Sequence, residues 1–74
     1  MIPDKEIVFL LELACEAVEL AEDGQRSAGY QLLLAGLVYA GLVADGGAEW
    51  GTDLVRRYRM VCASYRQWYG PRVQ

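Results

Sequence analysis

The sequence contains no histidine and only two cysteines. Without histidine no Ser-His-Asp or Cys-His arrangement can form, and the commonest general acid–base group at neutral pH is missing. Cys15 and Cys62 lie too far apart in the chain to make a CxxC ligand pair. We therefore expect a protein that is not an enzyme and that holds no metal or other cofactor. Both thiols are expected to be free and buried as small hydrophobic groups.

The chain is also short, and its sequence shows no targeting signal. Its 74 residues allow one small core, and chains below about 70 to 80 residues often need a metal, disulfides or oligomerisation for added stability. With the first two disfavoured, oligomerisation is the stabilising device that remains. The first charged side chain is at residue 4, and the N-terminus has no basic region followed by an apolar core, as a secretory signal would. These features predict a cytoplasmic protein.

Glycine-bearing breaks divide the sequence into three helical segments. They fall at Asp23-Gly24 and at Asp45-Gly46-Gly47, and Gly70-Pro71 ends the third segment. Gly24 and Gly46 are predicted to take the left-handed conformation that follows a helix end. The sequence thus predicts one domain, 1–74, with helices over about 4–23, 27–45 and 48–69 and a tail over 70–74. The expected fold is all-α: a compact three-helix, up-down-up bundle or a module based on a helical hairpin, assembled as a homo-oligomer.

The first and third segments are amphipathic. The first has acidic residues opposite its apolar face, which contains Ile7, Leu10, Leu11, Ala14, Ala17, Val18 and Ala21. The third has arginines opposite an aromatic face, which contains Trp50, Leu54, Val55, Tyr58, Val61, Cys62, Tyr65, Trp68 and Tyr69. Each of these helices is expected to have one face in the core and one in water.

The middle segment has no charged residue from Ser27 to Ala44, and its leucines and valines are distributed all round the helix. Such a helix has to be covered on every side, and two neighbours in a bundle cover roughly two thirds of it. The remaining strip is expected to contact a second copy of the chain, with small residues allowing a close approach. The predicted interface contains Gly29, Leu33, Gly36, Leu37, Ala40 and Val43.

A membrane is a weaker partner for this segment. Ala28 to Ala44 comprises 17 residues, which span about 25 Å against a hydrocarbon core of about 30 Å. Moving the segment into lipid would also leave the apolar faces of the other two helices uncovered. We therefore expect no membrane span.

Charge is divided along the chain. Residues 1–23 carry seven acids and one base, a net charge of −6, and residues 48–74 carry two acids and five arginines, a net charge of +3. This division favours the first helix lying beside the third, within one subunit or across an interface. The arginines predicted to face a partner are Arg56, Arg59 and Arg66. The overall charge of −3 argues against general nucleic-acid binding.

The three-helix layout includes a rhythm of small and larger residues that comprises Ala14, Ala17, Gly24, Tyr30, Leu33 and Ala40. In this architecture the chain resembles the MIT-type and TPR-type helical interaction modules. The sequence has no internal repeat of the 34-residue TPR kind. Neither family's binding residues are therefore transferred to this chain.

Three functions remain open from the sequence. The first is a small protein–protein interaction or assembly module that self-associates through its apolar central helix. The second is an adaptor that binds a ligand or a helical peptide of another protein in a groove lined by residues such as Tyr30, Tyr39, Trp50 and Trp68. The third is a nucleic-acid-associated regulator that uses the arginines of the third helix.

Overall fold

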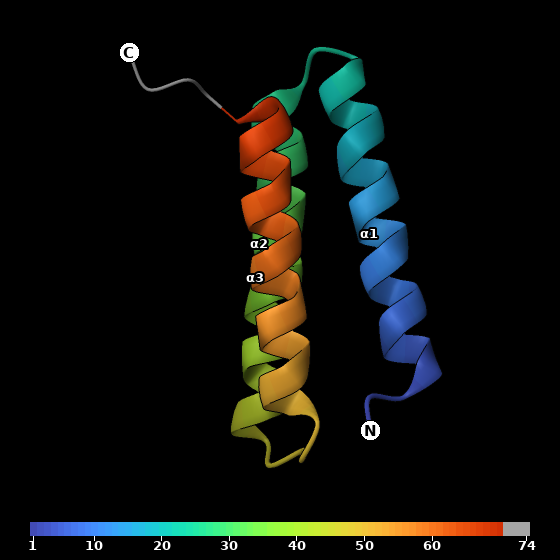
Figure 1. Cartoon of the computed structure of the whole chain (residues 1–74), viewed down its shortest axis with the longest axis vertical. Helices are drawn as coiled ribbons and strands as arrows, with labels where there is room; N and C mark the ends of the chain where they lie inside the picture. The colour runs from blue at the N-terminus through green and yellow to red at the C-terminus, as the bar shows by residue number, and fades with distance from the viewer. Residues whose placement is uncertain (71–74) are drawn as a thin grey trace.

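The computed structural model describes residues 1–70 and consists of three helices in that range: α1 (Asp4–Glu22), α2 (Arg26–Asp45) and α3 (Gly51–Tyr69). The helices alternate in direction, so α1 and α3 are parallel to each other and antiparallel to α2 (Figure 1). No strand is present in residues 1–70. The all-α, three-helix prediction is confirmed. Residues 71–74 of the predicted tail lie outside the described residues.

The helix ends agree closely with the glycine pattern, with one correction at the end of α2. Pro3 precedes the first helical residue, and Gly24 has a φ of +86° after α1. At the end of α2, however, Gly46 keeps a helical φ of −74° and Gly47 takes the left-handed value of +91°. The amide of Gly46 still donates to the Leu42 carbonyl at 2.9 Å, so α2 ends at Asp45 as predicted but the left-handed residue comes one position later than predicted.

The third helix begins at Gly51, three residues later than predicted. Residues 48–50 form a turn, in which the Gly51 amide donates to the Ala48 carbonyl at 3.0 Å. Gly51 is buried against α2: a Cβ at this position would lie 2.9 Å from the Cβ of Ala44. A glycine therefore allows the start of α3 to approach the end of α2.

The central helix of the fold is α2. It contacts both neighbours extensively, whereas α1 and α3 touch each other much less, and Figure 1 shows α1 set apart from α3 along their shared length. Two buried clusters follow from this arrangement. One contains Ala17, Ala21, Leu33, Cys62 and Tyr65; the other contains Leu10, Ala40, Leu54 and Tyr58.

Glycines on α2 accept tyrosine side chains from α3. The ring of Tyr58 contacts Gly36, and a Cβ on Gly36 would also lie 2.8 Å from the Leu13 side chain. The hydroxyl of Tyr65 lies against Gly29 and donates to the Arg26 carbonyl at 2.6 Å. Small residues thus let the backbones approach closely, and the large aromatic partners come from the same chain.

In α1 and α3, the residues at the centre of each predicted apolar face are buried, and a residue at the edge of each face is exposed. In α1, Leu10, Ala17 and Ala21 are buried, but Leu11 is exposed. In α3, all four central apolar residues of the helix are buried, namely Leu54, Tyr58, Cys62 and Tyr65. Trp68 is 76% exposed, contrary to prediction, because α1 and α3 do not close over each other at this edge.

Candidate interaction surfaces

The predicted interface residues of α2 lie mostly inside the subunit. Gly29, Leu33, Gly36 and Ala40 are buried against α1 and α3 of the same chain, which leaves them unavailable to a second chain in this packing. Leu37 and Val43 are partly buried. This choice of residues is corrected: the small-residue stripe serves the contact with α3, and the surface that a partner can reach lies elsewhere on α2.

The reachable surface of α2 is a ridge that we call the outer strip, made of Ala28, Gln31, Leu34, Ala35, Val38 and Leu42. All six are exposed, with Val38 at 64% and Leu42 at 65%. Positions 28, 31, 35, 38 and 42 alternate in steps of three and four residues, the spacing of a seam between packed helices. Sequence periodicity alone did not separate this arc from the buried one, because α2 is apolar on both.

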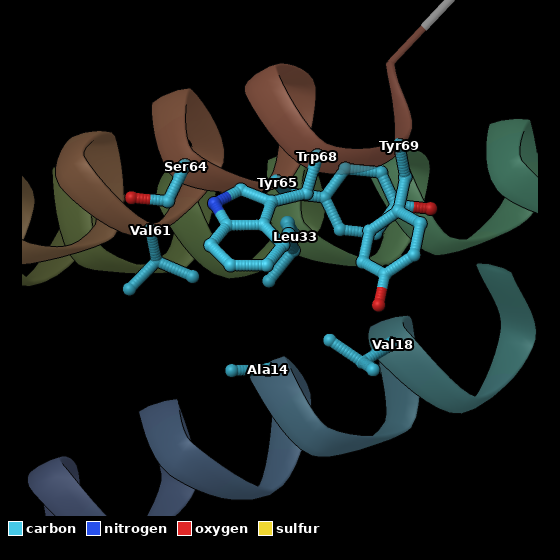
Figure 2. A pocket seen from close by; sticks show the side chains of 8 residues that line it. All are labelled: Ala14, Val18, Leu33, Val61, Ser64, Tyr65, Trp68 and Tyr69. Carbon is cyan, nitrogen blue, oxygen red and sulfur yellow. The ribbon is translucent and has the colours of Figure 1, made fainter. Parts of the chain in front are cut away.

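On the other side of α2, an apolar groove runs between α1 and α3. Its upper part is a hollow of about 230 Å³ beside Ala14, Val18 and Trp68, with Leu33 of α2 at its floor. Figure 2 shows Ala14 and Val18 of α1 on one side of the hollow and Trp68 and Tyr69 of α3 on the other. The groove exists because α1 and α3 diverge while both pack on α2.

The lower part of the groove continues the upper one through Val61, which lines both. This second hollow, of about 270 Å³, is bordered by Ile7 and Leu11 of α1 and by Arg57 and Met60 of α3. Arg57 is the one charged side chain among the described residues that line the two hollows. From Ile7 to Val18 the groove follows about 16 Å of α1. We use the name α1–α3 groove for both hollows together.

The predicted aromatic groove does not form. Tyr30 stacks on Tyr65 with ring centres 6.0 Å apart, and Tyr39 meets Phe9 edge to face at 5.5 Å. Trp50 packs against the buried cluster that contains Leu54 and Tyr58. These aromatics therefore lie at three separate places, and only Trp68 of the predicted set borders the α1–α3 groove.

The arginines of α3 that were predicted to face a partner are all exposed. Arg56 pairs with Asp53 of the same helix at 2.5 Å, and the guanidinium of Arg66 lies 5.9 Å from the centre of the Tyr30 ring. No ion pair joins α1 to α3 within residues 1–70. The opposite charges of these helices are thus not used for contact within the subunit.

A buried polar cluster that the sequence reading missed lies where α1 begins. Glu6 is 7% exposed, and its carboxylate accepts one shared hydrogen bond from the Tyr39 hydroxyl, whose oxygen lies 2.8 Å from each carboxylate oxygen. The hydroxyl of Tyr58 is buried without a hydrogen-bond partner in the described part of the chain. A signal was present in the sequence, since Glu6 heads the apolar spacing 6, 10, 13, 17 of α1.

Both tyrosines of this cluster hold their protons tightly. The hydrogen bond to Glu6, with smaller effects of burial and of the Glu6 charge, raises the pKa of Tyr39. Burial, followed by the nearby Glu6 charge, raises the pKa of Tyr58 to about 12. The cluster therefore favours neutral phenols beside one buried carboxylate.

The two cysteines occupy different environments. Cys62 is buried in the cluster that contains Leu33 and Tyr65, and burial raises the pKa of its thiol. Cys15 is exposed on α1, which corrects the expectation that both thiols are buried. Within residues 1–70, no group of three or more metal-binding side chains is close enough to hold an ion.

By length and composition alone, α2 would also be able to cross a membrane, and it is the one helix of the described residues that meets this test. Core helices of soluble proteins meet the same test. In this fold, α2 provides the glycines against which Tyr58 and Tyr65 pack. Transfer of α2 into lipid would separate it from those rings.

Comparison with known proteins adds no relative: no family model, no curated protein and no solved structure matches this chain.

Proposed function

We propose that this protein is a small helical interaction module that self-associates through the outer strip of α2. The observation that carries the proposal is the exposed apolar ridge itself, which has no charged residue between Ser27 and Ala44. An uncharged ridge of this length on a small soluble domain is a feature of interaction surfaces. Solvent-facing helices normally carry charged residues on that side.

The energetics support a reversible contact. Each 100 Å² of apolar surface removed from water contributes about 2.5 kcal/mol, whereas association costs roughly 4 to 15 kcal/mol in lost freedom. A single helix ridge provides only a few hundred Å², at the small end of specific interfaces. We therefore expect association that depends on protein concentration and is reversed by dilution.

The other two functions receive less support. An adaptor groove lined by the predicted aromatics does not form, as described above. For nucleic acid, the aromatic side chains that would stack on bases are mainly internal, since Tyr58 and Tyr65 are buried. Arg56 is also engaged with Asp53. These contacts favour a protein partner for the exposed surfaces.

The test measures mass in solution across a dilution series, by sedimentation, for the wild type and two variants. Val38→Lys places a charge in the outer strip and should weaken association at least tenfold. Val8→Lys is the matched control, because Val8 is 52% exposed on α1 and lies away from the outer strip; it should associate as the wild type does. A wild type that stays monomeric at high micromolar concentration, or that binds lipid vesicles through α2 instead, would contradict the proposal.

A further inference from the structure

The molecule has two uncovered apolar surfaces, and they point in opposite directions. Leu33 forms the floor of the α1–α3 groove, and Leu42 of the outer strip follows nine residues later, about two and a half turns further along α2. Leu42 therefore lies on the opposite side of the helix from Leu33. One surface is a concave groove between two helices, and the other is the convex ridge of a single helix.

The two surfaces match in length and in polarity. The outer strip extends about 21 Å from Ala28 to Leu42, and the groove follows about 16 Å of α1. The ridge is uncharged, and the groove has Arg57 at one end as its single charged side chain among the described lining residues. A ridge without charge can enter such a groove with no buried ion left unpaired.

Charges at the helix ends select one orientation. A docked α2 that runs in the same direction as the α2 of its host brings its Arg26 to the end of α1, where Glu19, Glu22 and Asp23 are clustered. Its Asp45 then lies at the opposite end, near Arg57. The reversed orientation would place Arg26 beside Arg57 and Asp45 beside the acids. The end that holds Arg57 also holds Asp4 and Asp53, so the orientation is selected at the end of α1, where Asp45 would face three acids in the reversed arrangement.

We infer that the outer strip of one copy inserts into the α1–α3 groove of the next copy, with both copies in the same orientation. This inference rests on the self-association proposed above and names the surface that receives the strip. The contact completes a four-helix arrangement in which the docked α2 is antiparallel to α1 and α3 of its host. Because the two surfaces differ and face opposite ways, the contact is heterologous, and it repeats along a stack of subunits rather than closing at a dimer.

The test uses one variant for each surface, both at exposed positions so that folding is retained. Val38→Lys alters the strip, and Leu11→Lys alters the groove; Leu42→Lys and Met60→Lys repeat the pair if either variant fails to fold. The wild type should pass beyond the mass of a dimer as concentration rises. Each variant alone should be monomeric, with association at least tenfold weaker.

The decisive measurement is an equimolar mixture of the two variants. The Leu11→Lys copy keeps a normal strip and the Val38→Lys copy keeps a normal groove, so the mixture should form a 1:1 dimer and nothing larger. A mixture that remains monomeric overturns the inference. If Val38→Lys loses association and Leu11→Lys retains it, the strip pairs with itself: the proposed self-association stands and the groove assignment is wrong. If Val38→Lys associates like the wild type, both are wrong.

Discussion

At the residue scale, glycine has two different roles within one helix. Gly36 faces the buried ring of Tyr58, whereas a Cβ on Gly41 would have nothing within 4 Å. Glycine costs a helix about 1 kcal/mol relative to alanine wherever it occurs. At Gly36 this cost is offset by the packing that the missing side chain allows, and at Gly41 it is not.

Alanine substitutions at these two positions should change stability in opposite directions. Gly41→Ala is expected to raise the free energy of unfolding by about 0.5 to 1 kcal/mol, through helix propensity alone. Gly36→Ala is expected to lower it by about 1 to 3 kcal/mol, because the rigid Tyr58 ring has to move. Urea denaturation followed by circular dichroism measures both. Equal stabilisation by the two changes would show that the ring does not rest on Gly36.

The tyrosines of the Glu6 cluster give the fold a dependence on alkaline pH. Because the pKa values of Tyr39 and Tyr58 are higher in the folded chain than the ordinary value of 10.0, the folded state holds these protons more tightly than the unfolded state. Their contribution is fully present below about pH 10 and is lost as pH rises through the folded values, for Tyr58 about 12.

The free energy of unfolding should therefore fall steadily between about pH 10 and 12. Tyr58→Phe removes one of the groups and should make that fall shallower. At neutral pH the same variant should cost little, since the hydroxyl has no partner to lose. Tyr65→Phe is the contrasting variant at neutral pH, because it removes a hydrogen bond of 2.6 Å to the Arg26 carbonyl and should cost more there. An unchanged pH profile in Tyr58→Phe would contradict this account.

At the element scale, the sequence predicted the helices well and their partners less well. Glycine and proline positions identified three helices with ends within about three residues, because these residues act locally. The helical periodicity of α1 and α3 identified the residues at the centre of each buried face, since each of these helices has one apolar face. On α2 the pattern is apolar all round, so periodicity did not decide which arc meets the protein's own helices.

That ambiguity explains the error at Gly29 and Gly36. Small residues were assigned to a contact between subunits, but the partners they accept are Tyr65 and Tyr58 of the same chain. The side chains that fill such a stripe belong to another element, and their register is a tertiary property. The candidate surfaces follow from the same fact: the outer strip is the arc of α2 that remains after α1 and α3 have been placed.

At the scale of the whole molecule, the acidic residues of α1 and the basic residues of α3 do not pair with each other in residues 1–70, although both helices flank α2. The last turn of α1 has no basic residue, although the negative end of a helix dipole favours one there. The cluster of Glu19, Glu22 and Asp23 is therefore unfavourable for the isolated subunit. Within a stack of subunits, it meets Arg26 of the neighbouring copy.

This leads to a prediction in which one substitution stabilises the monomer and weakens its association. Glu22→Lys should raise the free energy of unfolding of the monomer by about 0.3 to 1 kcal/mol, by opposing the dipole at the end of α1. The same change should weaken association several-fold, because two positive charges then face each other across the contact. Glu16→Lys is the control: it alters the net charge equally but lies in the middle of α1, on the side away from the groove. Thermal melts at low concentration and sedimentation at high concentration give the two readings. If Glu22→Lys strengthens association, the charges at the end of α1 do not meet Arg26 and the shared orientation of the stacked subunits is wrong.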